Sequence, residues 1–243
     1  MVAGSAAFVI GLSKTGIPGL GILAVTLLAI AMGDAKVSVG AMLPLLLVGD
    51  VFAVIYWHRK AVWPIIWRIL PPAAIGIVGG YFVLRHMSHG ILAHVLGGIV
   101  VCLITLQLLR DFGWFADERI PHHWAFAWGM GGLAGFVTGI SNAAGPIIII
   151  FLLAMNLDRF RFIGTIAVYF LILNAFKVPF FAELSIVSGP SLMFNLKLAP
   201  VVVAGCVVGL FAPRFIPERP FRWTMMALAA AAGLWLLIFG MGR

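Results

Sequence analysis

The sequence predicts an all-α integral membrane protein made of two inverted repeats, and three observations support this fold class. Hydrophobic residues make up 63% of the 243 residues and charged residues only 10%, whereas a soluble domain carries about a quarter charged residues. Apolar segments follow one another along the whole chain, and two motifs that interrupt them are alike. Because the chain lacks the polar residues to cover a water-facing surface, we expect one membrane domain over residues 1–243 and no soluble domain.

Ten apolar segments are separated by short polar connections. A helix needs about 20 residues to cross the hydrocarbon core of a bilayer, and several segments approach this length. Segments 2–13 and 145–156 hold only twelve residues each, which as helix span about 18 Å of a core about 30 Å thick. Segment 18–33 is also short. We expect 2–13 with 18–33, and 124–141 with 145–156, to form broken hairpins that resemble re-entrant loops. The ten segments are 2–13, 18–33, 37–57, 64–84, 91–109, 124–141, 145–156, 162–183, 191–212 and 221–241.

The two halves of the chain resemble each other. The motif GLSKTGIP at 11–18 matches GISNAAGP at 139–146 in glycine, serine and proline. A second stretch, whose offset pairs Asp50 with Asn174, matches Asp34, Gly40, Leu47, Phe52 and Val54 with Asp158, Gly164, Leu171, Phe176 and Val178. Three such matches in the same order indicate a duplication. Repeat 1 then covers about residues 1–110 and repeat 2 about 122–243, each a broken hairpin followed by three transmembrane helices. The best stretch pairs Pro71, Gly76, Val78, Gly80, Phe82 and Arg85 with Pro200, Gly205, Val207, Gly209, Phe211 and Arg214.

The loop charges predict how the repeats lie in the membrane. If each broken pair enters and leaves on one side, loops 58–63, 110–123, 156–161 and 213–222 share a side and hold nine basic residues, against three on the other side. Loops rich in Lys and Arg are cytoplasmic, so both termini are expected outside. Two full crossings through the short legs would give the same sides. Either way each repeat has an odd number of crossings, so repeat 2 is inverted. The nine are Arg59, Lys60, Arg110, Arg119, Arg159, Arg161, Arg214, Arg219 and Arg222.

The two breaks hold the residues that point to a ligand. Exposed backbone is not tolerated in lipid, so a break has to line a cavity or pack within protein. Helices are expected to begin at about Pro18 and about Pro146, and the free N–H groups and dipole of a helix N-terminus favour an anion. Lys14 adds a full positive charge. We predict an anion site near the midplane, as in transporters with inverted repeats. It comprises Ser13, Lys14, Thr15, Gly16, Gly19, Ser141, Asn142, Ala143 and Gly145.

Three further polar residues lie inside apolar segments. Intramembrane carboxylates are costly and usually functional, so Asp50 is a candidate for proton coupling or for the counter-ion of Lys14. Asn174 is its repeat partner. Lys177 either lines an anion pathway or extends its ammonium to the interface. The alternative to an anion site is a purely structural break, in which Lys14 only pairs with Asp50.

Other function classes find little support. The net charge of +8 comes mostly from short loops that set topology, so it does not indicate nucleic-acid binding. Cys102 and Cys206 lie in separate apolar segments and are expected to be small core residues. The histidines lack the convergent carboxylates or thiols of a metal site, and no nucleotide-binding or catalytic motif is present. We therefore expect no metal, no cofactor and no enzymatic activity.

With its motifs GLSKTGIPGLG and GFVTGISNAAGPIIIIFLL, the chain resembles the TauE/SafE family of sulfite exporters, also called the 4-toluene sulfonate uptake permease family. The resemblance covers almost the whole chain. It implies transport of sulfite or a small organosulfur anion across the bacterial inner membrane, driven by an ion gradient. Many members carry a run of glycines where this chain has Lys14, Thr15 and Gly16, and this departure favours an anion as ligand without naming it.

Two other classes stay open beside a secondary transporter. An anion channel would use the same break residues without gradient coupling. An integral membrane enzyme would need a polar cluster near one interface, and only His122 and His123 with Asp117 and Glu118 come close. The expected partners are a small anion and the lipid bilayer, and the sequence leaves open whether the chain forms a homodimer.

Overall fold

The structure is a computed structural model that describes residues 2–32, 35–86, 124–184 and 189–217, with a few isolated positions besides. Within these residues the chain consists of helices joined by short turns, and they contain no strand. The all-α prediction is therefore confirmed for this part of the chain. The expected segments 91–109 and 221–241 lie outside the described ranges.

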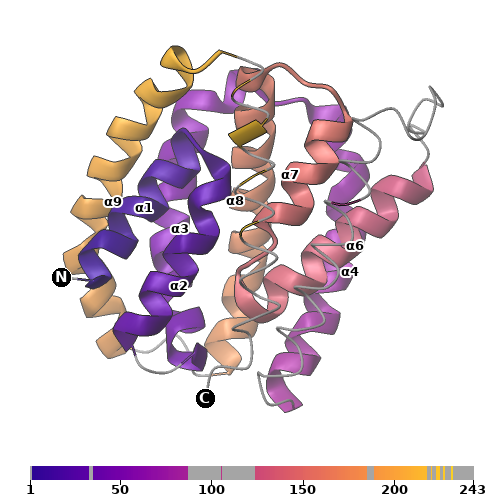
Figure 1. Cartoon of the computed structure of the whole chain (residues 1–243). Helices are drawn as coiled ribbons and strands as arrows, with labels where there is room; N and C mark the ends of the chain where they lie inside the picture. Colours follow the sequence, from indigo (N-terminus) through magenta and orange to yellow (C-terminus); the bar gives the residue numbers. More distant parts are fainter. Residues whose placement is uncertain are drawn as a thin grey trace.

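The first broken hairpin is formed by two short helices. Helix α1 (Val2–Thr15) is followed by the 3-10 turn η1 (Pro18–Leu20) and by α2 (Gly21–Met32). The chain turns back at the break, so that α1 packs against α2 (Figure 1). The long helix α3 (Ala35–Trp57) then packs against both.

The second broken hairpin repeats this arrangement. It is reached through the 3-10 turn η2 (His58–Lys60) and α4 (Trp63–His86), which follow α3. After the gap in the described chain, α6 (Trp124–Ser141) runs to the second break. Helix α7 (Gly145–Ala154) follows, and its residues from Pro146 to Leu153 are all buried. A helix that is apolar on every side belongs in the interior, which is where the run of four isoleucines places α7.

Two long helices complete the described fold. Helix α8 (Arg159–Glu183) begins three residues before the apolar segment predicted at 162, because the Asp158 carboxylate caps it and accepts from the backbone N–H groups of Phe160 and Arg161, both at 3.1 Å. Helix α9 is Gly189–Phe215. Four helices among the described residues, α3, α4, α8 and α9, are long and apolar enough to cross a membrane.

Each half of the chain packs a long helix against the broken hairpin of the other half. Helix α4 packs along α6 as α9 packs along α1, and α4 meets α8 as α9 meets α3. Glycines make the two tight contacts. A Cβ atom on Gly76 would collide with backbone atoms of Gly132 and Phe136, and one on Gly205 would collide with backbone atoms of Phe8. Small residues permit such close approach between membrane helices, and the glycines matched between the repeats provide it here within one chain.

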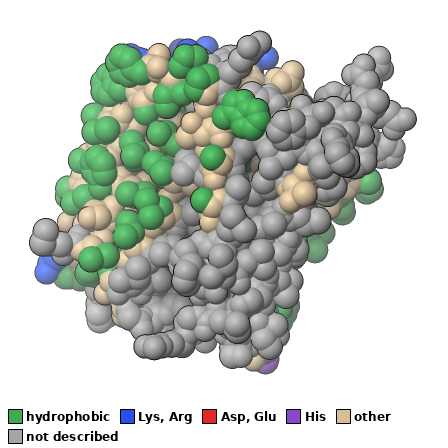
Figure 2. Space-filling model, viewed as in Figure 1, with side chains coloured by type: hydrophobic (Ala, Val, Ile, Leu, Met, Phe, Trp, Pro, Cys, Tyr) green, Lys and Arg blue, Asp and Glu red, His purple; other side chains and the backbone are tan. Residues whose placement is uncertain are grey.

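Basic loops gather at one end of the molecule. The backbone N–H of Val62 donates to Thr165 Oγ1 at 3.0 Å, Arg159 donates to the carbonyl of Ile216, and Arg214 donates to the hydroxyl of Tyr56 at 2.6 Å. Lys and Arg side chains lie along the upper edge of Figure 2, above a face of α9 covered by hydrophobic side chains. The exposed large hydrophobic side chains of α9 include Leu192, Met193, Leu196, Val207, Val208 and Phe211.

Candidate functional site

Each break leaves a helix N-terminus without a side-chain cap. At the first break, Ile17 precedes η1 and makes no capping hydrogen bond, and Pro18 opens the turn. At the second, Asn142 adopts the left-handed conformation with φ 56°, which Asn tolerates better than most residues, and Ala144 precedes α7 without capping it. Because neither start is capped by a side chain, first-turn N–H groups are left for a ligand.

A cavity of about 50 Å³ lies between the two breaks. A water molecule needs about 10–15 Å³ measured in this way, so the cavity suits a few waters or an anion of about four heavy atoms. Six of the nine residues predicted to bind the anion line it, and these are Ser13, Lys14, Gly19, Asn142, Ala143 and Gly145. Helix α8 contributes Ile166, Ala167, Phe170 and Asn174 to the same wall.

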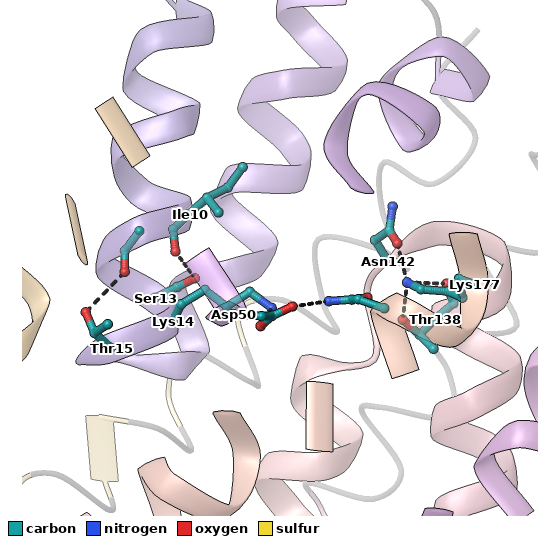
Figure 3. Close-up of polar contacts among 10 residues, drawn as sticks. Ile10, Ser13, Lys14, Thr15, Asp50, Thr138, Asn142 and Lys177 are labelled. Atoms are coloured by element: carbon teal, nitrogen blue, oxygen red, sulfur yellow. Dashed lines mark hydrogen bonds and ion pairs between the residues drawn. The ribbon is translucent and has the colours of Figure 1, made fainter. Parts of the chain in front are cut away.

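A buried chain of polar contacts joins the first break to α8 (Figure 3). The Lys14 ammonium lies 2.6 Å from Asp50 Oδ1, and Asn174 Nδ2 donates to Asp50 Oδ2 at 2.5 Å. Asp50 is 0% exposed and Lys14 11%. The Lys14 ammonium also lies 4.9 Å from the centre of the Phe170 ring, within the range of a cation–π contact. The Lys14–Asp50 pair that the sequence left as an alternative is therefore formed.

A second chain of contacts holds the other break. The Lys177 ammonium donates to Asn142 Oδ1 at 2.6 Å and to Thr138 Oγ1 at 3.0 Å. Asn142 Nδ2 donates to the carbonyl of Val39 in α3 at 3.0 Å. Lys177 is 0% exposed, so of the two readings of its sequence position, the one in which it extends to the interface is wrong. Its contacts instead fix Asn142 at the cavity wall.

The site holds more positive than negative charge. With all three groups ionised, Lys14 and Lys177 carry two positive charges and Asp50 one negative charge, which leaves a net charge of +1. Among the Asp, Glu, Lys and Arg side chains in the described part of the chain, only Asp50 and Lys177 are fully buried. Uncompensated buried charge is costly, so this arrangement favours a bound anion.

Three residues predicted at the site lie elsewhere. Thr15 Oγ1 donates to the carbonyl of Cys206 at 2.7 Å, and Gly16 packs on the backbone of Gly209, so both contact α9. Ser141 Oγ donates to the carbonyl of Val137 at 3.1 Å, one turn back in its own helix. Cavity-lining Ser13 does the same with Ile10 at 2.8 Å. These four hydroxyl and glycine positions shape the breaks through packing and local hydrogen bonds.

The sequence reading missed Thr138 and Phe170. Thr138 lies one helical turn before Asn142 in the motif TGISN, so the spacing of four residues could have placed it on the same face. Phe170 precedes Asn174 by four residues on α8 in the same way. Nothing in the sequence shows that this face of α8 meets Lys14. Within the described residues no group of His, Cys, Asp and Glu is placed to hold a metal ion.

The fold and the cavity define a class of protein, namely a multi-pass membrane protein with a charged cavity at two helix breaks. Residues 3–236 match the family described as sulfite exporter TauE/SafE. Since the match covers nearly the whole chain, the protein belongs to the TauE/SafE family of sulfite exporters. Comparisons with curated proteins and with solved structures gave no match.

Proposed function

We propose that the protein is a secondary transporter of a small anion, with sulfite or an organosulfur anion as the best-supported substrate. One observation carries the proposal: the cavity lies between two uncapped helix starts and beside two lysines and a single aspartate. Helix dipoles and an ammonium act on the same ligand there. Membership of a family of sulfite exporters supports a sulfur oxyanion.

The repeat structure supports alternating access around this cavity. The exchange of helix contacts, α4 on α6 against α9 on α1, is what a two-fold relation between the halves produces. The basic loops 58–63, 156–161 and 213–217 meet at one end, as the charge asymmetry requires if both hairpins are re-entrant. We propose an inverted repeat in the bacterial inner membrane, with these loops in the cytoplasm and both termini outside.

Asp50 has a defined place in this proposal. Its carboxylate pairs with the Lys14 ammonium when no substrate is bound, so the anion has to replace Asp50 as the partner of Lys14. Protonation of Asp50 would release Lys14 and couple the anion to a proton. The counter-ion role requires only the observed contact, and the coupling role requires in addition that Asp50 takes up a proton during transport.

Counterflow in proteoliposomes tests the proposed function. Vesicles loaded with unlabelled sulfite should accumulate labelled sulfite from outside for a short time, because a carrier exchanges one anion for another. Vesicles without protein serve as the control. An anion channel would instead dissipate the gradient with no transient accumulation, and it would conduct a steady anion current. Failure to move sulfite or any small sulfonate would refute the proposed transport activity.

A further inference from the structure

The geometry points to a monoanion that carries its own hydrogen-bond donor, such as hydrogen sulfite, as the form of substrate that the cavity selects. This inference rests on the proposed function, and it adds the charge and protonation state of the ligand. Two independent features of the described residues carry it. One is an amide oxygen without a partner on a residue that lines the cavity, and the other is the net charge of the lysine–aspartate cluster.

The amide of Asn174 has one end satisfied and one end free. Its Nδ2 donates to Asp50 Oδ2 at 2.5 Å, which fixes the orientation of the amide because a carboxylate cannot accept from the oxygen end. The opposite atom, Oδ1, is buried and has no hydrogen-bond partner in the described part of the protein. Asn174 is 1% exposed and lines the cavity. A buried acceptor without a donor is unfavourable, so an occupant of the cavity that brings an O–H group relieves it.

The other amide and hydroxyl side chains that line the cavity already have hydrogen-bond partners among the described residues. Asn142 uses both ends of its amide, accepting from Lys177 at 2.6 Å and donating to Val39 at 3.0 Å. Ser13 already donates within its own helix. An anion with no O–H therefore satisfies Lys14 and the helix starts but leaves Asn174 Oδ1 unpaired.

The charge of the cluster favours a single negative charge. With Lys14, Lys177 and Asp50 ionised, the net charge is +1, and these are the ionisable groups that α1, α3 and α8 bring together there. A monoanion neutralises the cluster, whereas a dianion leaves an excess of negative charge in a nearly dry site, which is costly. Hydrogen sulfite is a monoanion with a donor, and sulfite is a dianion with none.

Bicarbonate and nitrate test the donor separately from charge and shape. Both are planar monoanions of four heavy atoms, and only bicarbonate carries an O–H. Their dissociation constants are measured by calorimetry on the purified full-length protein, first as wild type and then as Asn174→Leu. We expect the bicarbonate-to-nitrate affinity ratio to fall by about five-fold in Asn174→Leu, the effect of one hydrogen bond. Leucine also removes the donor to Asp50, but that change affects both anions alike and cancels in the ratio.

Asn195→Leu is the matched control. Asn195 is another buried asparagine whose side-chain atoms have no partner among the described residues, and it lines a separate groove between α3 and α9. Removing its amide should leave the bicarbonate-to-nitrate ratio unchanged. An equal ratio in the wild type and Asn174→Leu would overturn the inference, even where both anions bind and the proposed anion site stands. Failure of every anion to bind the wild type would overturn the anion site and this inference together.

A second measurement uses only the wild type. The affinity for total sulfite is divided by the affinity for nitrate at several pH values around the pKa of hydrogen sulfite. Nitrate keeps its charge, so the quotient corrects for titration of the protein. The quotient should fall as the pH rises, in proportion to the hydrogen sulfite fraction. A quotient that stays constant or rises would mean that the dianion binds as well and would overturn the inference.

Discussion

Lys14, Asp50 and Asn174 form a line of contacts that no local feature of the sequence specifies. The sequence singled out each of these residues, because a charge or amide inside an apolar segment is costly and usually functional. The Lys14–Asp50 contact was one of two roles predicted for Asp50, the other being proton coupling. The link from Lys177 to Asn142 was not predicted, since the spacing along one helix does not reveal which face of a neighbouring helix it meets.

Removing the Asp50 carboxylate should destabilise the protein. Asp50→Asn leaves the Lys14 ammonium, 11% exposed, without its ion-pair partner. Loss of one member of a buried pair costs about 3–5 kcal/mol. We expect a lower unfolding temperature without substrate, measured in detergent, and partial recovery when sulfite is added, because a ligand of the folded state stabilises it.

Glu183→Gln provides the control for that measurement. Glu183 pairs with Arg85 at 3.5 Å, and both side chains are more than half exposed, so the pair contributes about 0–1 kcal/mol. If Asp50→Asn lowers the unfolding temperature no more than Glu183→Gln does, the Lys14–Asp50 pair is not a buried counter-ion pair. If sulfite stabilises the wild type but gives Asp50→Asn no recovery, Asp50 acts in substrate binding rather than as a stand-in for the anion.

At the scale of the helices, the sequence predicted which segments form helices better than it predicted where each helix begins and ends. The described helices coincide with eight of the predicted segments, and α6 matches 124–141 residue for residue. Segment 162–183 was placed too late because its first turn is polar, and the cap at Asp158 starts the helix at Arg159. Segment 18–33 was read as one helix, whereas the chain forms a 3-10 turn at Pro18 before α2 begins at Gly21.

The tight contact between α9 and α1 gives a prediction about a single methyl group. Gly205→Ala would place its Cβ against the backbone of Phe8, and a backbone carbonyl cannot move aside as a flexible side chain can. Overpacking of this kind costs about 1–3 kcal/mol. We expect Gly205→Ala to lower the unfolding temperature, measured by the loss of helical circular dichroism on heating.

Gly4→Ala is the control on the other side of the same helix pair. A Cβ atom on Gly4 has nothing within 4 Å, and alanine is favoured over glycine in a helix by up to about 1 kcal/mol. Gly4→Ala should leave the unfolding temperature unchanged or raise it. Equal losses for the two variants would show that the loss comes from the helix alone and not from the close contact between α9 and α1.

The whole molecule shows what duplication predicts and what it does not. The matched glycines Gly76 and Gly205 take equivalent places in the two repeats, and each allows a close contact between two helices. The sequence around them does not say which helix each one contacts. The exchange of partners, with α4 on α6 and α9 on α1, comes from the structure. The hairpins were predicted from segment length, because twelve residues of helix do not span the hydrocarbon core.

The topology of the whole molecule is tested by cysteine labelling. In a background without Cys102 and Cys206, single cysteines are placed at Lys60, Arg161 and His86, all of them exposed in the structure. Thr165 accepts from Val62, so the first two positions lie at the same end. A membrane-impermeant thiol reagent should label Lys60→Cys and Arg161→Cys from the cytoplasmic side, and His86→Cys from the outside. Labelling of all three from one side would refute the proposed arrangement.

The central claim is that the Lys14 ammonium binds the anion, and a calorimetric comparison of two variants tests it most directly. Asp50→Asn and the double variant Lys14→Ala/Asp50→Asn both lack the carboxylate, so they differ only in the ammonium. Because a charge-assisted hydrogen bond contributes about 1.5–3 kcal/mol, the double variant should bind sulfite about 10- to 150-fold more weakly. Lys197→Ala, which removes an exposed lysine of α9, should bind like the wild type. Equal sulfite affinity in Asp50→Asn and the double variant would contradict the account.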